Sequence, residues 1–249
     1  MYIKKEIHSG SVLEIEKLQN LKFHFKNTKR GPKISPTPNY MAKANERRAK
    51  KELARLINNN FLSGDMLITL TYAKDNRPQT PQETKNDIQN FLRNLKAAAK
   101  RKGKELLYVG VSNFDYCGVP HHHLLLNHIF TDAELQNIWS HGTINIKKLD
   151  NSGDYTKLAE YLLKHTNGIF QDHNRRVHAK RFLRSRNLKK PEVTITIIKS
   201  DSWRETPTAP KGYYLIVDSI VTIVNEITGY PYQYYKCIRL TPLQNLRAT

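Results

Sequence analysis

The stretch GVPHHHLLLN, Gly118 to Asn127, places three histidines directly before three leucines. An apolar run of this length that follows a Gly-x-Pro turn is typical of a buried strand. Successive side chains on a strand point to opposite faces, so we expect His121 and His123 to share one face and His122 to point to the other. Two imidazoles about 7 Å apart on one strand face can bind a single metal ion. The alternative is a strand end whose histidines are exposed or hydrogen-bonded and bind no metal.

Strand and helix patterns alternate on both sides of this stretch. We predict strands at 66–72, 105–112, 121–129 and 143–149, and helices at 80–103, 131–142 and 153–168. Thr80 followed by Pro81 predicts the start of the first of these helices, and Thr131 with Glu134 has capping-box spacing. The first six elements form a split βαβ pattern, which closes as an antiparallel sheet with helices on one face. We therefore expect an α+β fold of ferredoxin-like topology, with one further helix after this unit.

The flanking segments differ from this central part. We expect residues 1–40 to form a loosely ordered basic arm, residues 41–190 to form the main domain, and residues 191–249 to form a β-rich C-terminal extension. Alternating apolar residues at 192–200, 213–225 and 233–240 predict strands in the extension. Its tyrosines could stack on nucleic-acid bases, but aromatic residues at strand spacing favour a core role; they are Tyr213, Tyr214, Tyr230, Tyr232, Tyr234 and Tyr235.

Charge is the strongest compositional feature. The 249 residues include 41 Lys and Arg and 22 Asp and Glu, which gives a net charge of +19. This excess favours a nucleic-acid partner over a membrane surface, because cationic side chains release counterions from phosphates and no amphipathic membrane helix or lipidation signal is evident. Nine of the basic residues lie between 164 and 190. We expect that segment to hold a DNA backbone through Arg175, Arg176, Lys180, Arg181, Arg184 and Arg186.

The absence of certain patterns sets the expected compartment. No run approaches the roughly 18 apolar residues of a membrane span, and the first 20 residues lack the apolar region of a secretory signal. The two cysteines, Cys117 and Cys237, are far apart and lack the paired spacing of a zinc site. We therefore expect a cytoplasmic protein with no membrane partner.

A tyrosine on the last predicted helix of the central part is a candidate nucleophile. Tyr161 and Lys164 are three residues apart and so share a helix face, with Lys157 one turn before and His165 one turn after the tyrosine. A phenol has a pKa of about 10, so it attacks poorly unless a cation or metal stabilises the phenolate. Tyr155 stands off this face, and we do not count it as a second nucleophile.

Three motifs in this order, LITLTY, PHHHLLL and YLLK, resemble those of the HUH endonucleases, and specifically the rolling-circle replication initiators of bacterial plasmids and phages. The resemblance covers about residues 40–195. It implies that Mg²⁺ or Mn²⁺ held by His121 and His123 polarises a phosphate of single-stranded DNA. Tyr161, assisted by the charge of Lys164, would then form a 5′-phosphotyrosine and free a 3′-OH, and the reverse reaction would re-join the strand.

The chain departs from the family at the third metal ligand. Family members usually carry an acidic residue on the strand before the histidine strand, and this chain has Asn113 at that place. An Asn carbonyl oxygen suits Mg²⁺ or Mn²⁺ but is neutral and therefore a weaker ligand. Asn113, the adjacent Ser112 and Asp115 all remain candidates for the third ligand.

Two other functions remain open. The chain could be a non-catalytic nucleic-acid-binding protein on the same fold, or a related HUH transposase or relaxase. Relaxases tend to have the nucleophile near the N-terminus and a cluster of three histidine ligands, whereas Tyr161 follows the histidines. The resemblance further implies an origin hairpin as substrate and a host DNA polymerase as partner. Because the chain has no Walker-type motif, we expect a host helicase to unwind the DNA.

Overall fold

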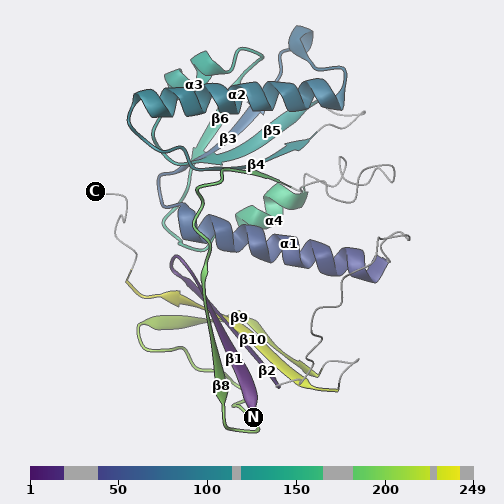
Figure 1. Cartoon of the computed structure of the whole chain (residues 1–249), viewed down its shortest axis with the longest axis vertical. Helices are drawn as coiled ribbons and strands as arrows, with labels where there is room; N and C mark the ends of the chain where they lie inside the picture. Colours follow the sequence, from purple (N-terminus) through teal and green to yellow (C-terminus); the bar gives the residue numbers. More distant parts are fainter. Residues whose placement is uncertain (20–38, 114–118, 165–181, 225–228, 242–249) are drawn as a thin grey trace. The chain divides into compact units, whose positions relative to one another are not determined.

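The computed structural model describes residues 1–19, 39–113, 119–164, 182–224 and 229–241 (Figure 1). The chain divides into two compact units. Residues 50–189 form the central unit, and residues 1–49 together with 190–249 form the terminal unit. Within the described ranges, no helix is both long enough and apolar enough to cross a membrane.

The central unit is built on a five-stranded sheet of order β6-β3-β5-β4-β7. Every neighbouring pair in it is antiparallel. The strands are β3 (Met66–Thr71), β4 (Tyr108–Asn113), β5 (His121–Leu126), β6 (Ile144–Lys148) and β7 (Leu183–Arg184). The order of the first four is the one that a split βαβ pattern generates, so the predicted α+β class with an antiparallel sheet is confirmed.

Helices lie on both faces of this sheet (Figure 1). The two helices of the six-element unit, α2 (Pro81–Arg101) and α3 (Asp132–Ile138), cover one face as predicted. Thr80 caps α2 by accepting a hydrogen bond from the Glu83 amide, and Thr131 and Glu134 form the expected capping box of α3. The additional helix, α4 (Thr156–Lys164), lies on the opposite face. α1 (Asn39–Asn60) precedes β3, and a short 3₁₀ helix, η1 (Lys74–Asn76), follows it.

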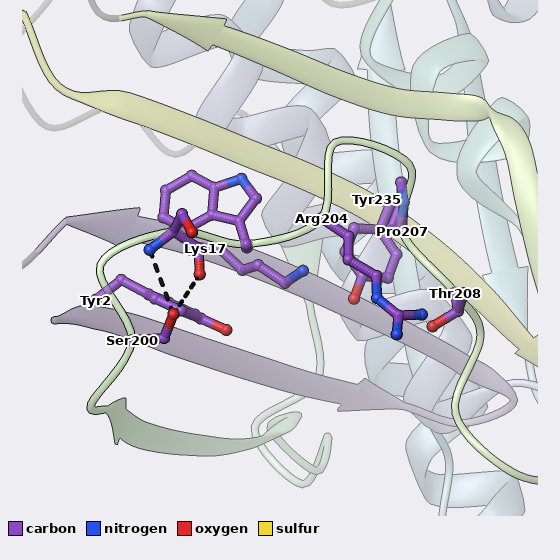
Figure 2. Close-up of a pocket in the computed structure, with 9 residues that line it drawn as sticks. Tyr2, Lys17, Ser200, Arg204, Pro207, Thr208 and Tyr235 are labelled. Atoms are coloured by element: carbon purple, nitrogen blue, oxygen red, sulfur yellow. Dashed lines mark hydrogen bonds between the residues drawn. The ribbon is translucent and has the colours of Figure 1, made fainter.

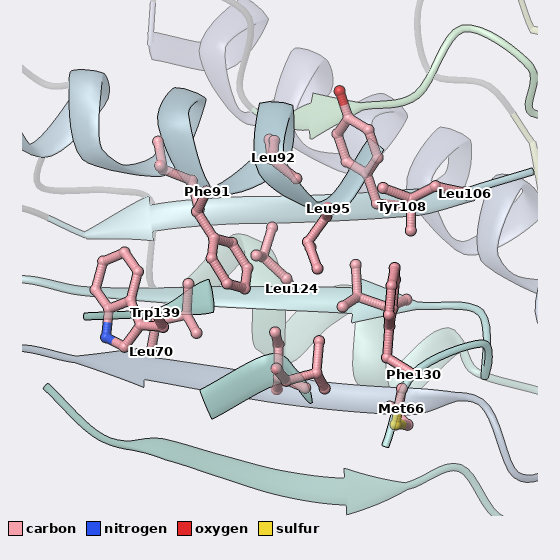
Figure 3. Close-up of a cluster of buried hydrophobic side chains, with 14 of the residues drawn as sticks. Met66, Leu70, Phe91, Leu92, Leu95, Leu106, Tyr108, Leu124, Phe130 and Trp139 are labelled. Carbon is pink, nitrogen blue, oxygen red and sulfur yellow. The ribbon is translucent and has the colours of Figure 1, made fainter. Parts of the chain in front are cut away.

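The main core fills the space between the sheet and helices α2 and α3 (Figure 3). Alternate residues of β3 point into it, as the period of a strand requires, and Leu124 and Leu126 of β5 pack beside them. Phe91 and Leu95 come from α2, and Trp139 closes the end of the core nearest to His122. Because this face of β5 is anchored in the core, the histidines at its start are held at fixed positions.

The terminal unit is a second five-stranded antiparallel sheet, of order β8-β1-β2-β10-β9. Its strands are β1 (Tyr2–Ser9), β2 (Val12–Gln19), β8 (Glu192–Ile198), β9 (Tyr213–Val224) and β10 (Pro231–Arg239). The three strands predicted near the C-terminus are present. Tyr234 and Tyr235 are buried, as the core interpretation requires, whereas Tyr214 and Tyr230 are exposed.

The loosely ordered arm expected over residues 1–40 is wrong for residues 2–19. These residues form a hairpin whose two-residue turn begins at Gly10, which has a positive φ of 60°. The hairpin lies between β8 and β10, and its apolar residues Leu13 and Ile15 pack against Tyr235 and Cys237. Burial of these side chains outweighs the high charge that suggested an arm.

Candidate functional site

The register of the central sheet places the three histidines as predicted from strand alternation. His121 lies opposite Thr71 of β3 and Asn113 of β4, and His123 lies opposite Thr69 in the next row of the same face. The rings of His121 and His123 are in contact, with centroids 4.9 Å apart. His122 points to the other face and is fully buried.

Hydrogen bonds at Nδ1 orient the two histidines of the first face. His121 Nδ1 lies 2.9 Å from the Val119 carbonyl oxygen, which can only accept, so Nδ1 carries the proton in the neutral ring. That tautomer leaves the lone pair on Nε2, the arrangement commonly found in metal-binding histidines. His123 Nδ1 lies 3.0 Å from Thr69 Oγ1, so the LITLTY motif supplies the residue that holds His123.

His122 belongs to a buried polar network on the core side of the sheet. Its Nδ1 is 2.7 Å from Ser112 Oγ, its Nε2 is 2.8 Å from the Tyr72 hydroxyl, and Tyr72 donates to Asp87 Oδ2 at 3.2 Å. Burial lowers the pKa of His122 to about 3, so the ring is neutral at neutral pH. Burial, assisted by Asp87, raises the pKa of Tyr72. One set of donors satisfies all these groups: Ser112 donates to His122, His122 to Tyr72, and Tyr72 to Asp87.

Of the three candidates for a third ligand, Asn113 shares the face of His121 and His123. Ser112 points to the opposite face, where it bonds to His122, so it is removed as a candidate. Asp115 lies outside the described residues. Among the residues whose positions are described, no three His, Cys, Asp or Glu side chains form a group that could hold a metal ion. The described donor set is therefore two imidazoles with the amide of Asn113 beside them.

Tyr161 lies on α4 with its ring against His123. The ring centroids are 5.3 Å apart, and 43% of the tyrosine remains exposed. Lys164, the last residue of α4, is exposed and stands three positions along the helix. His165 lies outside the described residues. The structure thus brings Tyr161 to the face of the sheet that carries His121 and His123.

Tyr155, the other tyrosine near α4, has a different environment. It is buried and donates a hydrogen bond of 2.9 Å to the Asp150 carbonyl. Burial, with a smaller effect of nearby carboxylates, raises the pKa of Tyr155 to about 12. A buried phenol that is engaged as a donor is a poor nucleophile, which agrees with its exclusion on sequence grounds.

The predicted DNA-binding cations are only partly described. Arg184 and Arg186 are exposed, and Arg184 lies opposite Val109, on the face of the sheet that carries His123. Its guanidinium is 3.2 Å from a carboxylate oxygen of Glu52. The other four predicted cations lie outside the described residues: Arg175, Arg176, Lys180 and Arg181.

Sequence reasoning did not identify the residues that hold the histidines. Thr69 and Tyr72 were noted as part of a motif, but their hydrogen bonds to His123 and His122 follow from the pairing of β3 with β5. Trp139 was also missed. Its indole donates to the Thr71 carbonyl at 2.9 Å, and its ring contacts those of Tyr72 and His122. An aromatic residue at the end of a capped helix was the available signal.

Comparison with known protein families gives one match. Residues 65–166 match the family of the replication-associated protein ORF2. This range contains β3, β5 and α4, and thus His121, His123 and Tyr161. The match supports a replication-associated protein with a role in the initiation of replication.

Other comparisons add little. No curated protein matches the chain. Among solved structures, the hypothetical protein ORF119 from Sulfolobus islandicus rod-shaped virus 1 is similar at 15% sequence identity and a TM-score of 0.33. That similarity covers 46% of this chain and 91% of the viral protein.

Proposed function

We propose that the chain is a rolling-circle replication initiator that nicks single-stranded DNA at an origin hairpin and re-joins it. Tyr161 is the nucleophile, and the reaction depends on Mg²⁺ or Mn²⁺ near His121 and His123. The observation that carries the proposal is the contact of the Tyr161 ring with His123 on the face that also holds His121. The family match over residues 65–166 gives independent support for a replication role.

The proposed chemistry is a transesterification. The Tyr161 oxygen forms a bond to the scissile phosphorus, and the bond from phosphorus to the 3′ oxygen breaks. The phenol loses its proton to solvent, and the departing 3′ oxygen gains one, which leaves a 5′-phosphotyrosine and a free 3′-OH. The number of phosphoester bonds is unchanged, so attack by a 3′-OH on the phosphotyrosine re-joins a strand.

Three side chains would hold the divalent ion: His121, His123 and Asn113. Imidazole nitrogens suit transition metals and an amide oxygen suits harder ions, so this mixed set fits Mn²⁺ better than Mg²⁺. When bound, such an ion polarises the phosphate and stabilises the negative charge that develops during attack. The Val119 carbonyl and Thr69 keep the two imidazoles in a fixed orientation toward it.

The surroundings of Tyr161 fit a phosphate substrate. Lys164 on the same helix face provides positive charge that favours the phenolate form of a nearby tyrosine. Arg184 lies on the same face of the sheet, and together with Arg186 and the cations at 175, 176, 180 and 181 it would contact the DNA backbone. Host helicase and DNA polymerase would then extend the free 3′-OH.

The test is formation of a covalent adduct. Wild-type protein, single-stranded origin DNA and Mn²⁺ should give a denaturant-resistant protein–DNA species, and mass spectrometry should find the phosphate on Tyr161. Tyr161→Phe removes only the attacking oxygen, so DNA binding should persist while cleavage and adduct disappear. Tyr214→Phe, at another exposed tyrosine, is the matched control and should behave as wild type. An adduct formed by Tyr161→Phe would reject the assignment.

One observation favours a second candidate, a non-catalytic nucleic-acid-binding protein on the same fold. Asn113 stands where an acidic ligand is expected, and the described residues contain no three-residue group of His, Cys, Asp or Glu. The same experiment separates the two: wild-type protein that binds the DNA but forms no adduct with either ion would favour the non-catalytic function. Asn113→Asp would then be expected to restore nicking.

A further inference from the structure

The terminal unit contains a cavity of about 520 Å³ on one face of its sheet (Figure 2). The sheet contributes Tyr2 of β1, Lys17 of β2 and Tyr235 of β10, and the segment after β8 contributes Trp203 and Arg204. A cavity of this volume is within the range of small-molecule binding sites. All of its lining residues belong to the terminal unit, so it is separate from the proposed nicking residues.

Aromatic rings and cations together line this cavity. The rings of Tyr2 and Trp203 meet edge to face with centroids 5.0 Å apart, and the Lys17 ammonium lies 5.3 Å from the Tyr235 ring centroid. Arg204 is exposed at the cavity. None of the lining residues is Asp or Glu. The cavity therefore offers flat apolar surfaces and positive charge, and no carboxylate to repel an anion.

The site is held together by a buried amide. Gln233 is fully buried, and its Oε1 accepts a hydrogen bond of 2.9 Å from Lys17 Nζ. Its Nε2 donates to the backbone carbonyls of Arg204 and Glu205, at 3.1 and 2.8 Å. One side chain therefore fixes both the strand cation and the segment that carries Trp203 and Arg204. Such anchoring gives the cavity a defined shape before any ligand binds.

Lys17 is a costly residue to bury without purpose. Only 8% of it is exposed, and its described hydrogen bond is to a neutral amide. Burial, with a smaller contribution from Lys4, lowers the pKa of Lys17, which reflects the cost of keeping its charge away from water. A bound anion would offset that cost, whereas a purely structural position is better filled by an apolar side chain.

We infer that this cavity binds one unpaired nucleotide of a single-stranded DNA. The base stacks on Trp203 and Tyr2, and the phosphate is bound by Lys17 and Arg204. Stacking on aromatic rings combined with a cationic track is the common way in which proteins bind single strands. The choice of DNA as the strand rests on the proposed function; the nucleotide chemistry rests on the cavity alone.

Binding of the full-length protein to a labelled single-stranded oligodeoxynucleotide tests the inference. Fluorescence anisotropy is measured in EDTA, so that no strand is cut. Trp203→Ala, Arg204→Ala and Lys17→Met should each weaken binding about tenfold, the scale of losing one stacked base or one charge-assisted contact. Lys211→Ala removes an exposed cation of the same unit outside the cavity and should change affinity less than about threefold. Cavity variants that bind as tightly as Lys211→Ala would overturn the inference.

Tryptophan fluorescence places the contact. The chain has two tryptophans, Trp139 in the core of the central unit and Trp203 at the cavity. The oligonucleotide should quench the wild-type protein, and Trp203→Phe, which keeps an aromatic ring, should remove that quenching. Quenching that persists in this variant would overturn the inference. A mononucleotide such as dTMP should compete only weakly; binding as tight as that of the oligonucleotide would identify a free nucleotide rather than a strand as the ligand and would also overturn it.

The two proposals fail in different ways. If the cavity does not bind DNA, the variants at Trp203 and Arg204 will keep wild-type affinity while wild-type protein still forms its Tyr161 adduct. If the nicking proposal is wrong, no adduct will form, but quenching of Trp203 in EDTA will remain.

Discussion

His122 differs from its two neighbours in what its ring contacts. Its imidazole bonds to Ser112 and Tyr72 within the core, whereas the rings of His121 and His123 meet on the other face of the sheet. Neutral at physiological pH, His122 fixes the start of β5 through its hydrogen bonds. The stretch that looks like one histidine motif therefore divides into a pair available for chemistry and one residue that supports them.

The first prediction separates these roles by substitution. His122→Ala should lower the free energy of unfolding by about 3 kcal/mol, because it creates a cavity and leaves two buried hydroxyls without a partner. His121→Ala, at a half-buried position, should cost less than about 1 kcal/mol but abolish Mn²⁺-dependent nicking. Denaturant titration and a nicking assay measure the two effects. Equal stability losses would show that the strand faces are assigned wrongly.

Strand alternation made the positions of these histidines predictable, because side-chain direction is a local property of the chain. Their partners were not predictable in the same way. Tyr72 and Ser112 reach His122 only through the pairing of β5 with β3 and β4, and pairing depends on the whole sheet. The exclusion of Ser112 as a ligand needed this register.

At the scale of elements, the connection from α3 to β6 passes very close to the end of β3. The Thr71 amide donates to the Thr143 carbonyl, and the Ala73 amide donates to the His141 carbonyl at 2.8 Å. A Cβ on Gly142, between these two contacts, would stand 2.2 Å from the Thr71 carbonyl oxygen. Any residue larger than glycine must therefore displace the backbone that leads from the LITLTY strand to Tyr72.

The second prediction follows from this close approach. Gly142→Ala should lower the free energy of unfolding by about 3 kcal/mol or more, since backbone atoms cannot move aside as a side chain can. Gly103→Ala is the control: that glycine has a positive φ but open space around it, so its cost should be only about 1 to 2 kcal/mol. Thermal unfolding of both variants decides, and equal shifts would refute the steric argument.

Elements with strong local signals were predicted well, and the one that was missed depends on distant partners. The caps at Thr80 and Thr131 define α2 and α3 from sequence alone. The hairpin of β1 and β2 also has a turn signal at Gly10, but its lysine-rich strands look like a charged arm until β8 and β10 are placed beside them. Strand propensity is dominated by such neighbours.

At the scale of the whole molecule, each unit has a core of its own. The third prediction uses one fully buried isoleucine from each, Ile15 in the terminal unit and Ile68 in the central unit. Either change to alanine should cost about 2 to 5 kcal/mol. Hydrogen exchange should show lost protection mainly in β1, β2 and β10 for Ile15→Ala, and mainly in β3 and β5 for Ile68→Ala. Loss spread evenly over both units would mean that they unfold as one.

The net charge of +19 gives the fourth prediction. Affinity for single-stranded DNA should fall steeply with salt, and replacing Arg175, Arg176 and Arg184 together by glutamine should reduce the slope of log K against log salt by about 2, from roughly 0.7 per lost phosphate contact. The control removes the same charge from the opposite side of the central sheet, at Lys85, Lys100 and Arg101 of α2, and should leave the slope nearly unchanged. Similar slopes in both triple variants would place the DNA elsewhere.

The arrangement of β1 and β2 between β8 and β10 has a consequence for synthesis on the ribosome. The hairpin emerges first, yet Leu13 pairs with Cys237, which is translated near the end. At about 5 to 20 residues per second, the hairpin waits on the order of ten seconds or more with both edges open to other chains. The central unit is contiguous in sequence and can complete its contacts during that interval. The part of the protein made first is therefore the part that finishes folding last.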